Sequence, residues 1–188
     1  KIKLYSELSY LTSSKQYINS IYFKGFNGIS MDTRNATNFI DEETESEIIK
    51  LKGGFVWDTG KITNYDGTET DVFYIIRVIN DINMTSNKLA IMKINISEED
   101  LSKIYSDKIF GKQDDFLIID SDNRIVSSID KTRLGQQFDL DIPNNGVDDL
   151  KNGYFQSKLN NQDYLVTYYD IESVDYRLIN FVPLDELL

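Results

Sequence analysis

Hydrophobic residues follow a helical period in the first part of the chain and form short strand-like runs in the rest. Between residues 5 and 22 the apolar and aromatic positions recur on one helical face, which predicts an N-terminal helix. Residues 41–52 form a second predicted helix, because acidic side chains crowd its first turn and lysines occupy its end. Ser97 precedes three acidic residues in the pattern of an N-cap, which predicts a third helix to about residue 108.

Runs of β-branched and aromatic residues, separated by turn residues, predict two groups of strands. The first group consists of residues 55–58, 72–79 and 89–96, with turns at residues 59–60 and 65–67. The second group consists of residues 115–120, 124–128, 153–155, 164–169 and 176–183, with hairpin turns at residues 121–123 and 160–163. Pro183 suits the first turn of a helix, so a terminal helix is predicted from that residue onward.

This order of elements predicts an α+β fold. Strands joined by short hairpin turns pair in antiparallel fashion, so each group is expected to form one antiparallel sheet with helices. We expect a long N-terminal helix over residues 1–24, the end of a longer helix, running beside both modules. A first module is expected over residues 25–108 and a second over residues 109–188, with the boundary near residues 109–113.

Composition removes several kinds of chemistry. The 188 residues include no histidine and no cysteine, which excludes the commonest general base, thiol nucleophiles, disulfides and cysteine-type zinc sites. Only carboxylates, Lys, Ser or Tyr remain for catalysis, and no carboxylate pair can be placed from the sequence. The net charge of −11 disfavours nucleic acid and anionic membranes as partners.

Residues 139–146 alternate Asp with other residues and end on a glycine, as calcium loops do. The segment lacks the full spacing and the terminal glutamate of such a loop, so we predict an ordinary acidic loop and no metal or cofactor. No apolar run approaches the roughly 20 residues that span a bilayer. The chain opens on Lys1 rather than methionine, which is expected of a piece taken from a longer protein, for example from between two membrane spans.

A hairpin, a Leu-Gly pair, a Tyr-Leu-Val strand and a strand ending in proline follow one another in the last third of the chain. They are residues 116–120 with 123–128, residues 134–135, residues 164–166 and residues 178–183. This order resembles the membrane-proximal half of double Cache (dCache) domains, the extracytoplasmic PAS-like sensor modules of bacterial histidine kinases and chemoreceptors. In the first half, residues 89–96 followed by Ser97 and its acidic helix start look like the strand-to-helix join of Gram-positive sensor kinases.

The resemblance implies both a fold and a function. The two modules would be PAS-like, the first membrane-distal and the second membrane-proximal. The chain would be the extracellular ligand-sensing domain of a membrane-spanning signal-transduction receptor, above all a two-component sensor histidine kinase. A small molecule would bind in the distal module, and the domain itself would catalyse nothing. The full-length receptor would dimerise through the N-terminal helix, whereas the isolated domain could be a monomer.

Alternative functions stay open at this point. The same kind of domain could serve a methyl-accepting chemoreceptor or a diguanylate cyclase, because the output domain is not part of this sequence. A secreted hydrolase that acts through carboxylates is an alternative of another class, and it would show a converging Asp or Glu pair in an open cleft. A binding module without a signalling role is a third.

Four residues of the first module are candidates for ligand binding: Trp57, Tyr74, Arg77 and Asp81. Arg77 lies within a predicted strand, where it shares a face with apolar neighbours by alternation. Its guanidinium could hold a ligand carboxylate or phosphate; alternatively, it could pair with Asp58 or Asp81 or lie on a solvated face. Trp57 could stack on a ligand or pack at the core rim.

Two further aromatic features limit the ligand prediction. The amino-acid-binding version of the family carries a tyrosine followed by an adjacent arginine–aromatic pair. That motif is absent here as a unit, so the resemblance does not imply an amino-acid ligand. In the second module, Tyr164 and Tyr168 should share one strand face and Tyr169 the other. Core and sheet packing is expected for all three, with a proximal pocket as the alternative.

Overall fold

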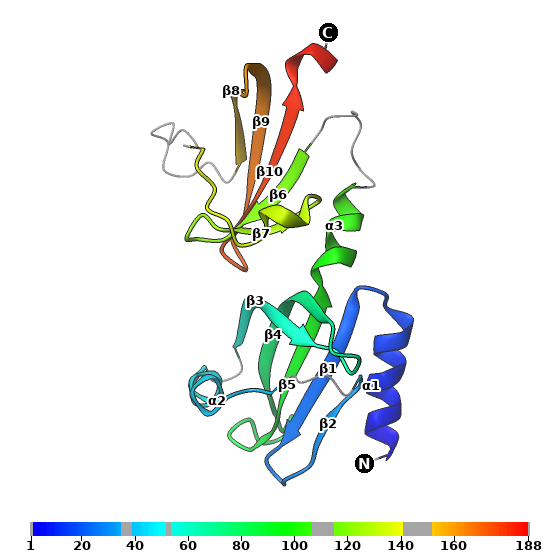
Figure 1. The fold of residues 1–188 in the computed structure, drawn as a ribbon. Helices are drawn as coiled ribbons and strands as arrows, with labels where there is room; N and C mark the ends of the chain where they lie inside the picture. Colours follow the sequence, from blue (N-terminus) through cyan, green and yellow to red (C-terminus); the bar gives the residue numbers. More distant parts are fainter. Residues whose placement is uncertain (1, 35–38, 52–53, 107–114, 141–151, 188) are drawn as a thin grey trace. The chain divides into compact units, whose positions relative to one another are not determined.

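The computed structural model describes residues 2–34, 39–51, 54–106, 115–140 and 152–187. The chain divides into two compact units, Lys1–Leu101 and Ser102–Leu188, and each contains one five-stranded antiparallel sheet (Figure 1). The predicted α+β fold with two antiparallel sheets is therefore confirmed. The predicted module boundary near residues 109–113 lies outside the described residues, and so does most of the predicted acidic loop.

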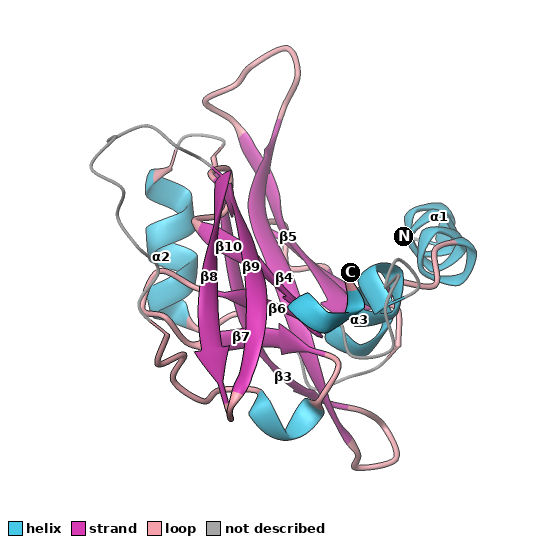
Figure 2. Ribbon diagram, turned by 90° about the horizontal axis from the view of Figure 1, so that it is seen from above, coloured by secondary structure: helices cyan, strands magenta, loops and turns pink. Residues whose placement is uncertain are grey.

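The first unit has its sheet between two helices. Its strands are ordered β2-β1-β5-β4-β3. Figure 2 shows α1 and α2 on opposite sides of this sheet. Its elements are α1 (Ile2–Ser14), β1 (Ile18–Gly25), β2 (Ser30–Asp32), α2 (Glu42–Lys50), β3 (Phe55–Thr63), β4 (Glu69–Asn80) and β5 (Lys88–Ser97).

The second unit repeats the same strand order. Its sheet runs β7-β6-β10-β9-β8, which is the order of the first sheet with each strand number raised by five. The elements are β6 (Asp115–Ile119), β7 (Ile125–Ser128), β8 (Asn152–Leu159), β9 (Gln162–Ile171) and β10 (Tyr176–Pro183), with 3-10 turns at Lys131–Arg133 and Leu184–Glu186. The predicted terminal helix is thus a single 3-10 turn within the described residues.

The N-terminal helix is shorter than predicted. Helix α1 has 13 residues and ends at Ser14, and the chain from Ile18 onward forms a strand between β2 and β5. Ile21 and Tyr22 point to opposite faces of that strand, and Ile21 is almost fully buried. A strand covered on both sides carries a near-continuous apolar run, which a helical period can also fit. The prediction of helix over residues 15–22 was therefore wrong.

Helix α2 follows the prediction closely. The Asp41 side chain accepts a hydrogen bond from the Thr44 amide at 2.8 Å, as an N-cap does. Ile48 is fully buried and packs with Ile76, Val78 and Ile91 of the sheet. This contact fixes α2 over one face of β4 and β5.

The predicted turn at residues 59–60 was wrong. Thr59 and Gly60 lie in the middle of β3, opposite Phe73 and Val72. A Cβ at Gly60 would lie 3.3 Å from Cε1 of Tyr74, so the glycine makes room for that ring rather than forming a turn. The turn predicted at residues 65–67 is present, with Gly67 at φ +82°.

Helix α3 (Glu98–Ser106) begins as predicted, with the Ser97 hydroxyl accepting from the Asp100 amide at 3.2 Å. In the second unit, the Tyr105 and Ser127 hydroxyls are 2.7 Å apart. The hairpin between β8 and β9 turns at Asn160 and Asn161, both with positive φ, as a two-residue type I′ turn requires.

Among the described residues, none of the helices has the length and hydrophobicity required to cross a bilayer. The same part of the chain contains no group of three or more acidic side chains arranged to hold a metal ion.

Candidate functional site

A row of polar side chains crosses the face of the first sheet that α2 covers. The strand register places Asp58, Tyr74, Asn95 and Ser20 opposite one another on β3, β4, β5 and β1. Lys93 lies on the same face, two positions before Asn95 on β5. We call these five residues the polar patch.

Tyr74 and Lys93 form the centre of the polar patch. The Tyr74 hydroxyl donates to Asp58 Oδ2 at 3.1 Å, and the Lys93 ammonium lies 4.3 Å from the Tyr74 ring centroid. Burial, followed by the Asp58 charge and hydrogen bond, raises the pKa of Tyr74 to about 12. Burial lowers the pKa of Lys93, and the charges of Asp41 and Asp58 oppose that shift. The site therefore contains a half-buried cation stacked on a neutral phenol.

Asn95 adds a buried acceptor beside Tyr74. Its side chain is fully buried, and its Nδ2 donates to the Ser20 hydroxyl at 2.8 Å. Its Oδ1 has no hydrogen-bond donor among the described residues. A buried carbonyl without a donor costs about 1–3 kcal/mol, so a bound molecule that donates to it would recover stabilisation.

The second unit repeats the arrangement of tyrosine and cation. Tyr168 of β9 and Arg177 of β10 occupy the strand positions that Tyr74 and Lys93 occupy in β4 and β5. The Arg177 guanidinium carbon lies 5.2 Å from the Tyr168 ring centroid. In each sheet the cation lies opposite the residue two positions after the tyrosine.

That opposite residue differs between the units. It is Asp170 in the second unit, where the carboxylate pairs with Nε of Arg177 and, at 3.0 Å, with its Nη2. It is the buried Ile76 in the first unit. Lys93 accordingly makes no ion pair within the described part of the chain. The first unit keeps the cation and lacks its counter-ion.

The structure separates the predicted site residues. Tyr74 belongs to the polar patch, whereas Trp57 lies on the opposite face of the sheet, with its ring 5.9 Å from that of Phe73. Arg77 is exposed on that opposite face, with the apolar alternation predicted for it. Asp81 lies in the β4–β5 hairpin and accepts from the Asn83 amide at 2.8 Å. Among the described residues Arg77 pairs with neither Asp58 nor Asp81.

Sequence reasoning missed Lys93 and Asn95. The available signal was their position inside a strand whose other residues are mostly apolar. Burying a polar side chain in such a strand costs free energy unless the side chain is hydrogen-bonded, so its presence indicates a specific role. Asp58 was considered only as an ion-pair partner of Arg77. Alternation places these two residues on opposite faces, which the register of β3 and β4 confirms.

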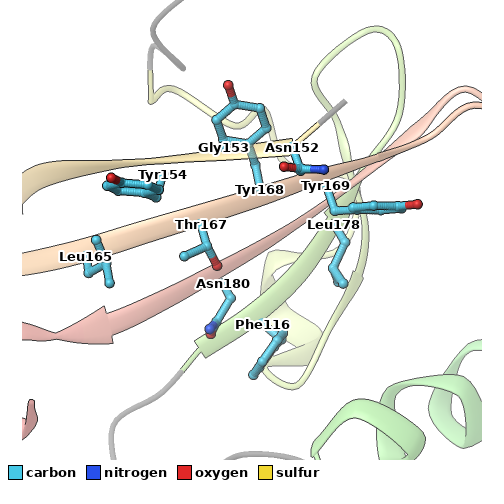
Figure 3. A pocket seen from close by; sticks show the side chains of 10 residues that line it. All are labelled: Phe116, Asn152, Gly153, Tyr154, Leu165, Thr167, Tyr168, Tyr169, Leu178 and Asn180. Atoms are coloured by element: carbon cyan, nitrogen blue, oxygen red, sulfur yellow. The ribbon is translucent and has the colours of Figure 1, made fainter. Parts of the chain in front are cut away.

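The three tyrosines of β9 lie on the faces predicted for them, but only Tyr164 and Tyr168 show the predicted core packing. Tyr164 and Tyr168 pack on the core side, against Phe181 and Phe155 respectively. Tyr169 is on the outer face, where it borders a shallow cavity of about 490 Å³ (Figure 3). Leu165, Thr167, Leu178 and Asn180 form its floor, and the half-exposed Tyr169 and largely exposed Tyr154 border it. Its lining carries no charged side chain, and Asn180 Oδ1 is buried without a donor among the described residues.

Comparison with known proteins identifies the fold. No protein-family model matches the chain, and no curated protein matches it by sequence. The extracellular domain of the protein rpHK1S-Z16, described as a histidine kinase, has a TM-score of 0.68 at 12% identity, covering 100% of this chain and 79% of that one. The ligand-binding domain of the Pseudomonas fluorescens chemoreceptor CtaA, in complex with L-serine, has a TM-score of 0.68 at 13% identity, covering 97% and 79%.

A third similar structure is the ligand-binding domain of the Pseudomonas aeruginosa PAO1 amino acid chemoreceptor PctB, in complex with L-Arg. Its TM-score is 0.64 at 11% identity, covering 99% of this chain and 87% of that one. The chain thus has the fold of the extracellular sensor domains of histidine kinases and chemoreceptors. The fold predicted from the dCache resemblance is confirmed.

Proposed function

We propose that this chain is the extracellular ligand-sensing domain of a membrane-spanning receptor, and that its first unit binds a small molecule at the polar patch. The likeness of fold to sensor domains supports the sensing role. The observation that carries the site is Lys93, a half-buried cation over Tyr74 whose counter-ion position is occupied by Ile76. A ligand anion would complete the arrangement that Asp170 completes in the second unit.

The chemistry of the polar patch defines the ligand. Lys93 offers a cation for a carboxylate or similar group. Asn95 Oδ1 on β5 and the Asp58 carboxylate on β3 offer acceptors on the two strands that flank Tyr74. A small molecule with an anionic group and a nearby ammonium or hydroxyl donor satisfies both, and an α-amino acid has this combination. Two of the structurally similar domains are in complex with L-serine and L-Arg, which is consistent with that class.

The finer features of the receptor belong to the same proposal. The first unit would be membrane-distal and the second membrane-proximal, with α1 as the end of a longer helix through which the receptor dimerises. The output would be a histidine kinase, with a chemoreceptor or diguanylate cyclase as the alternative. We propose no catalytic role for the domain, because the structurally similar proteins are described as extracellular or ligand-binding domains of receptors.

Ligand binding can be tested directly on the purified domain. A thermal-shift screen of the common amino acids and of small hydroxy and keto acids should identify a compound that raises the melting temperature, because a ligand that binds only the folded state stabilises it. Calorimetric titration of that compound should then give a dissociation constant in the micromolar range, about 8 kcal/mol of binding free energy.

Matched variants assign the site. Lys93→Met should weaken binding at least tenfold, because the ligand anion would be buried without its cation. Lys61→Met is the control, since Lys61 lies in the same sheet on the opposite face and pairs with Glu69 at 3.2 Å. Equal affinity of the parent and Lys93→Met proteins would remove the polar patch as the site.

A further inference from the structure

A cavity of the first unit lies at the end of β4. It has a volume of about 1120 Å³ and is lined by the end of α2, the last residues of β4 and the β4–β5 hairpin. Three of its lining side chains are cations: Lys50, Arg77 and Lys88. Its lining on β4 begins at Arg77, which is three residues beyond Tyr74, roughly 10 Å at about 3.3 Å per residue, and shares no residue with the polar patch.

The cations around this cavity lack counter-ions within the described part of the chain. Lys50, Arg77 and Lys88 form no ion pair within the described residues. Asp81 is the acid among the lining residues, and its two oxygens already face the hairpin: Oδ1 accepts from the Asn83 amide at 2.8 Å and Oδ2 from Asn87 Nδ2 at 3.5 Å. The chain as a whole has a net charge of −11, but these three cations make the cavity locally positive. A locally positive cavity attracts a small anion.

A buried acceptor also lies at the cavity. Among the described residues, strand β3 pairs with β4 as far as Phe55 opposite Arg77. The residues of β4 from Val78 to Asn80 have β5 on one side and the cavity beside them. Asn80 Oδ1 is buried and has no donor among the described residues. The cavity therefore presents cations together with one acceptor that needs a hydroxyl or amine.

We propose that this cavity binds a small, multiply charged oxyanion that carries a hydroxyl, as hydrogen phosphate and citrate do. Arg77 would grip two oxygens through its planar fork, Lys88 would neutralise the remaining charge, and the hydroxyl would donate to Asn80 Oδ1. Lys50 would contribute least, because it lies in the last turn of α2, where it also offsets the partial negative charge of the helix end. The proposal does not depend on ligand binding at the polar patch.

The test is calorimetric titration of the domain with sodium phosphate and, separately, with sodium citrate, against sodium chloride at the same ionic strength. We expect saturable binding with a dissociation constant below about 1 mM for at least one of the two oxyanions. The oxyanion with the lower dissociation constant shows whether the natural ligand carries phosphate or carboxylate groups. If neither binds more tightly than chloride up to about 10 mM, the proposal is wrong.

Variants separate a specific site from general charge attraction. Arg77→Gln should weaken oxyanion binding at least tenfold, Arg77→Lys by less, and Arg77→Gln with Lys88→Gln should abolish it. Lys61→Gln, which removes the same charge elsewhere in the sheet, should leave it within twofold. Arg77, Lys88 and Lys61 are exposed, so these variants should fold as the parent does, and circular dichroism and melting temperatures check this. Oxyanion binding that survives in the double variant would overturn the proposal.

Discussion

The two sheets share one strand order, and their covered faces carry different residues at the same positions. The row Asp58–Tyr74–Asn95–Ser20 of the first unit corresponds to Gly153–Tyr168–Ile179–Leu117 of the second. Only the tyrosine is common to both rows. In the second unit Tyr168, Ile179 and Leu117 belong to the apolar core, whereas in the first unit Asn95 is buried with an unpartnered oxygen.

The treatment of charge differs in the same way. Arg177 is stacked on a tyrosine and paired with Asp170, and this hydrogen bond raises its pKa. Lys93 is stacked on a tyrosine without such a partner, and burial lowers its pKa. In the second unit, the cation over the tyrosine already has a carboxylate partner. In the first unit, a ligand anion could take the place of that partner. Unsatisfied polar groups at equivalent positions favour the first unit as the binding unit.

Exchanging the central residue of the two rows should have the largest effect. Ile179→Asn would bury an amide in the apolar core of the second unit and should lower the free energy of unfolding by about 3 kcal/mol. Asn95→Ile, the reverse change, should alter it by no more than about 1 kcal/mol, because it removes an unsatisfied acceptor while leaving the Ser20 hydroxyl without its donor. Urea unfolding measures both, and equal losses in the two variants would contradict the difference between the rows.

Breaking the ion pair of the second unit should have the next largest effect. Asp170→Asn would leave the guanidinium of Arg177, about a third exposed, without its carboxylate. We expect a loss of about 1–2 kcal/mol in the free energy of unfolding, less than for a fully buried pair because solvent screens the charges. Asp163→Asn on the same strand is the control; a loss there as large as that at Asp170 would argue against a specific pair.

Removing the cation of the first unit should act in the opposite direction. Lys93→Met should leave stability unchanged or raise it by up to about 1 kcal/mol, because a half-buried charge without a counter-ion is replaced by an apolar chain of similar length. Since the pKa of Lys93 is lowered in the folded state, the unfolded chain binds more protons just below pH 10.5. The parent should therefore gain stability relative to Lys93→Met as pH rises through that window, which melting curves at a series of pH values would show.

The smallest effect concerns the tyrosine of the polar patch. Tyr74→Phe should cost about 1 kcal/mol or less, because it removes one hydrogen bond to an exposed carboxylate. The pKa of Tyr74 is raised to about 12, so its contribution to stability is complete below pH 10 and is lost between pH 10 and 12. The tyrosinate absorbance difference between parent and Tyr74→Phe should appear near pH 12, and a difference centred at pH 10 would contradict burial of this hydroxyl.

Much of the fold could be predicted because local signals agreed with it. Asp41 and Ser97 cap helices as their sequences indicated, and the asparagine turn at residues 160–161 forms the expected hairpin. The errors came from tertiary context. Residues 18–22 read as helix because a strand covered on both faces loses its alternation, and Gly60 read as a turn because its contact with the Tyr74 ring lies across the sheet.

The site could be predicted only in part for the same reason. Tyr74 was selected as one of four polar or aromatic candidates of the first module, and Arg77 and Asp81 line a cavity of their own. The significance of Lys93 depends on Ile76 standing where the second unit has Asp170, and that comparison requires the registers of both sheets. A sequence without a known register cannot reveal which cation lacks its counter-ion.

The measurement that tests the central claim most directly is the crystal structure of the domain with the compound that the thermal-shift screen selects. We expect the anionic group of the ligand to lie within about 4 Å of the Lys93 ammonium, the distance of an ion pair, and a donor group of the ligand to contact Asn95 Oδ1. A ligand bound in the second unit, or one bound in the first unit that leaves Lys93 uncontacted, would contradict this claim.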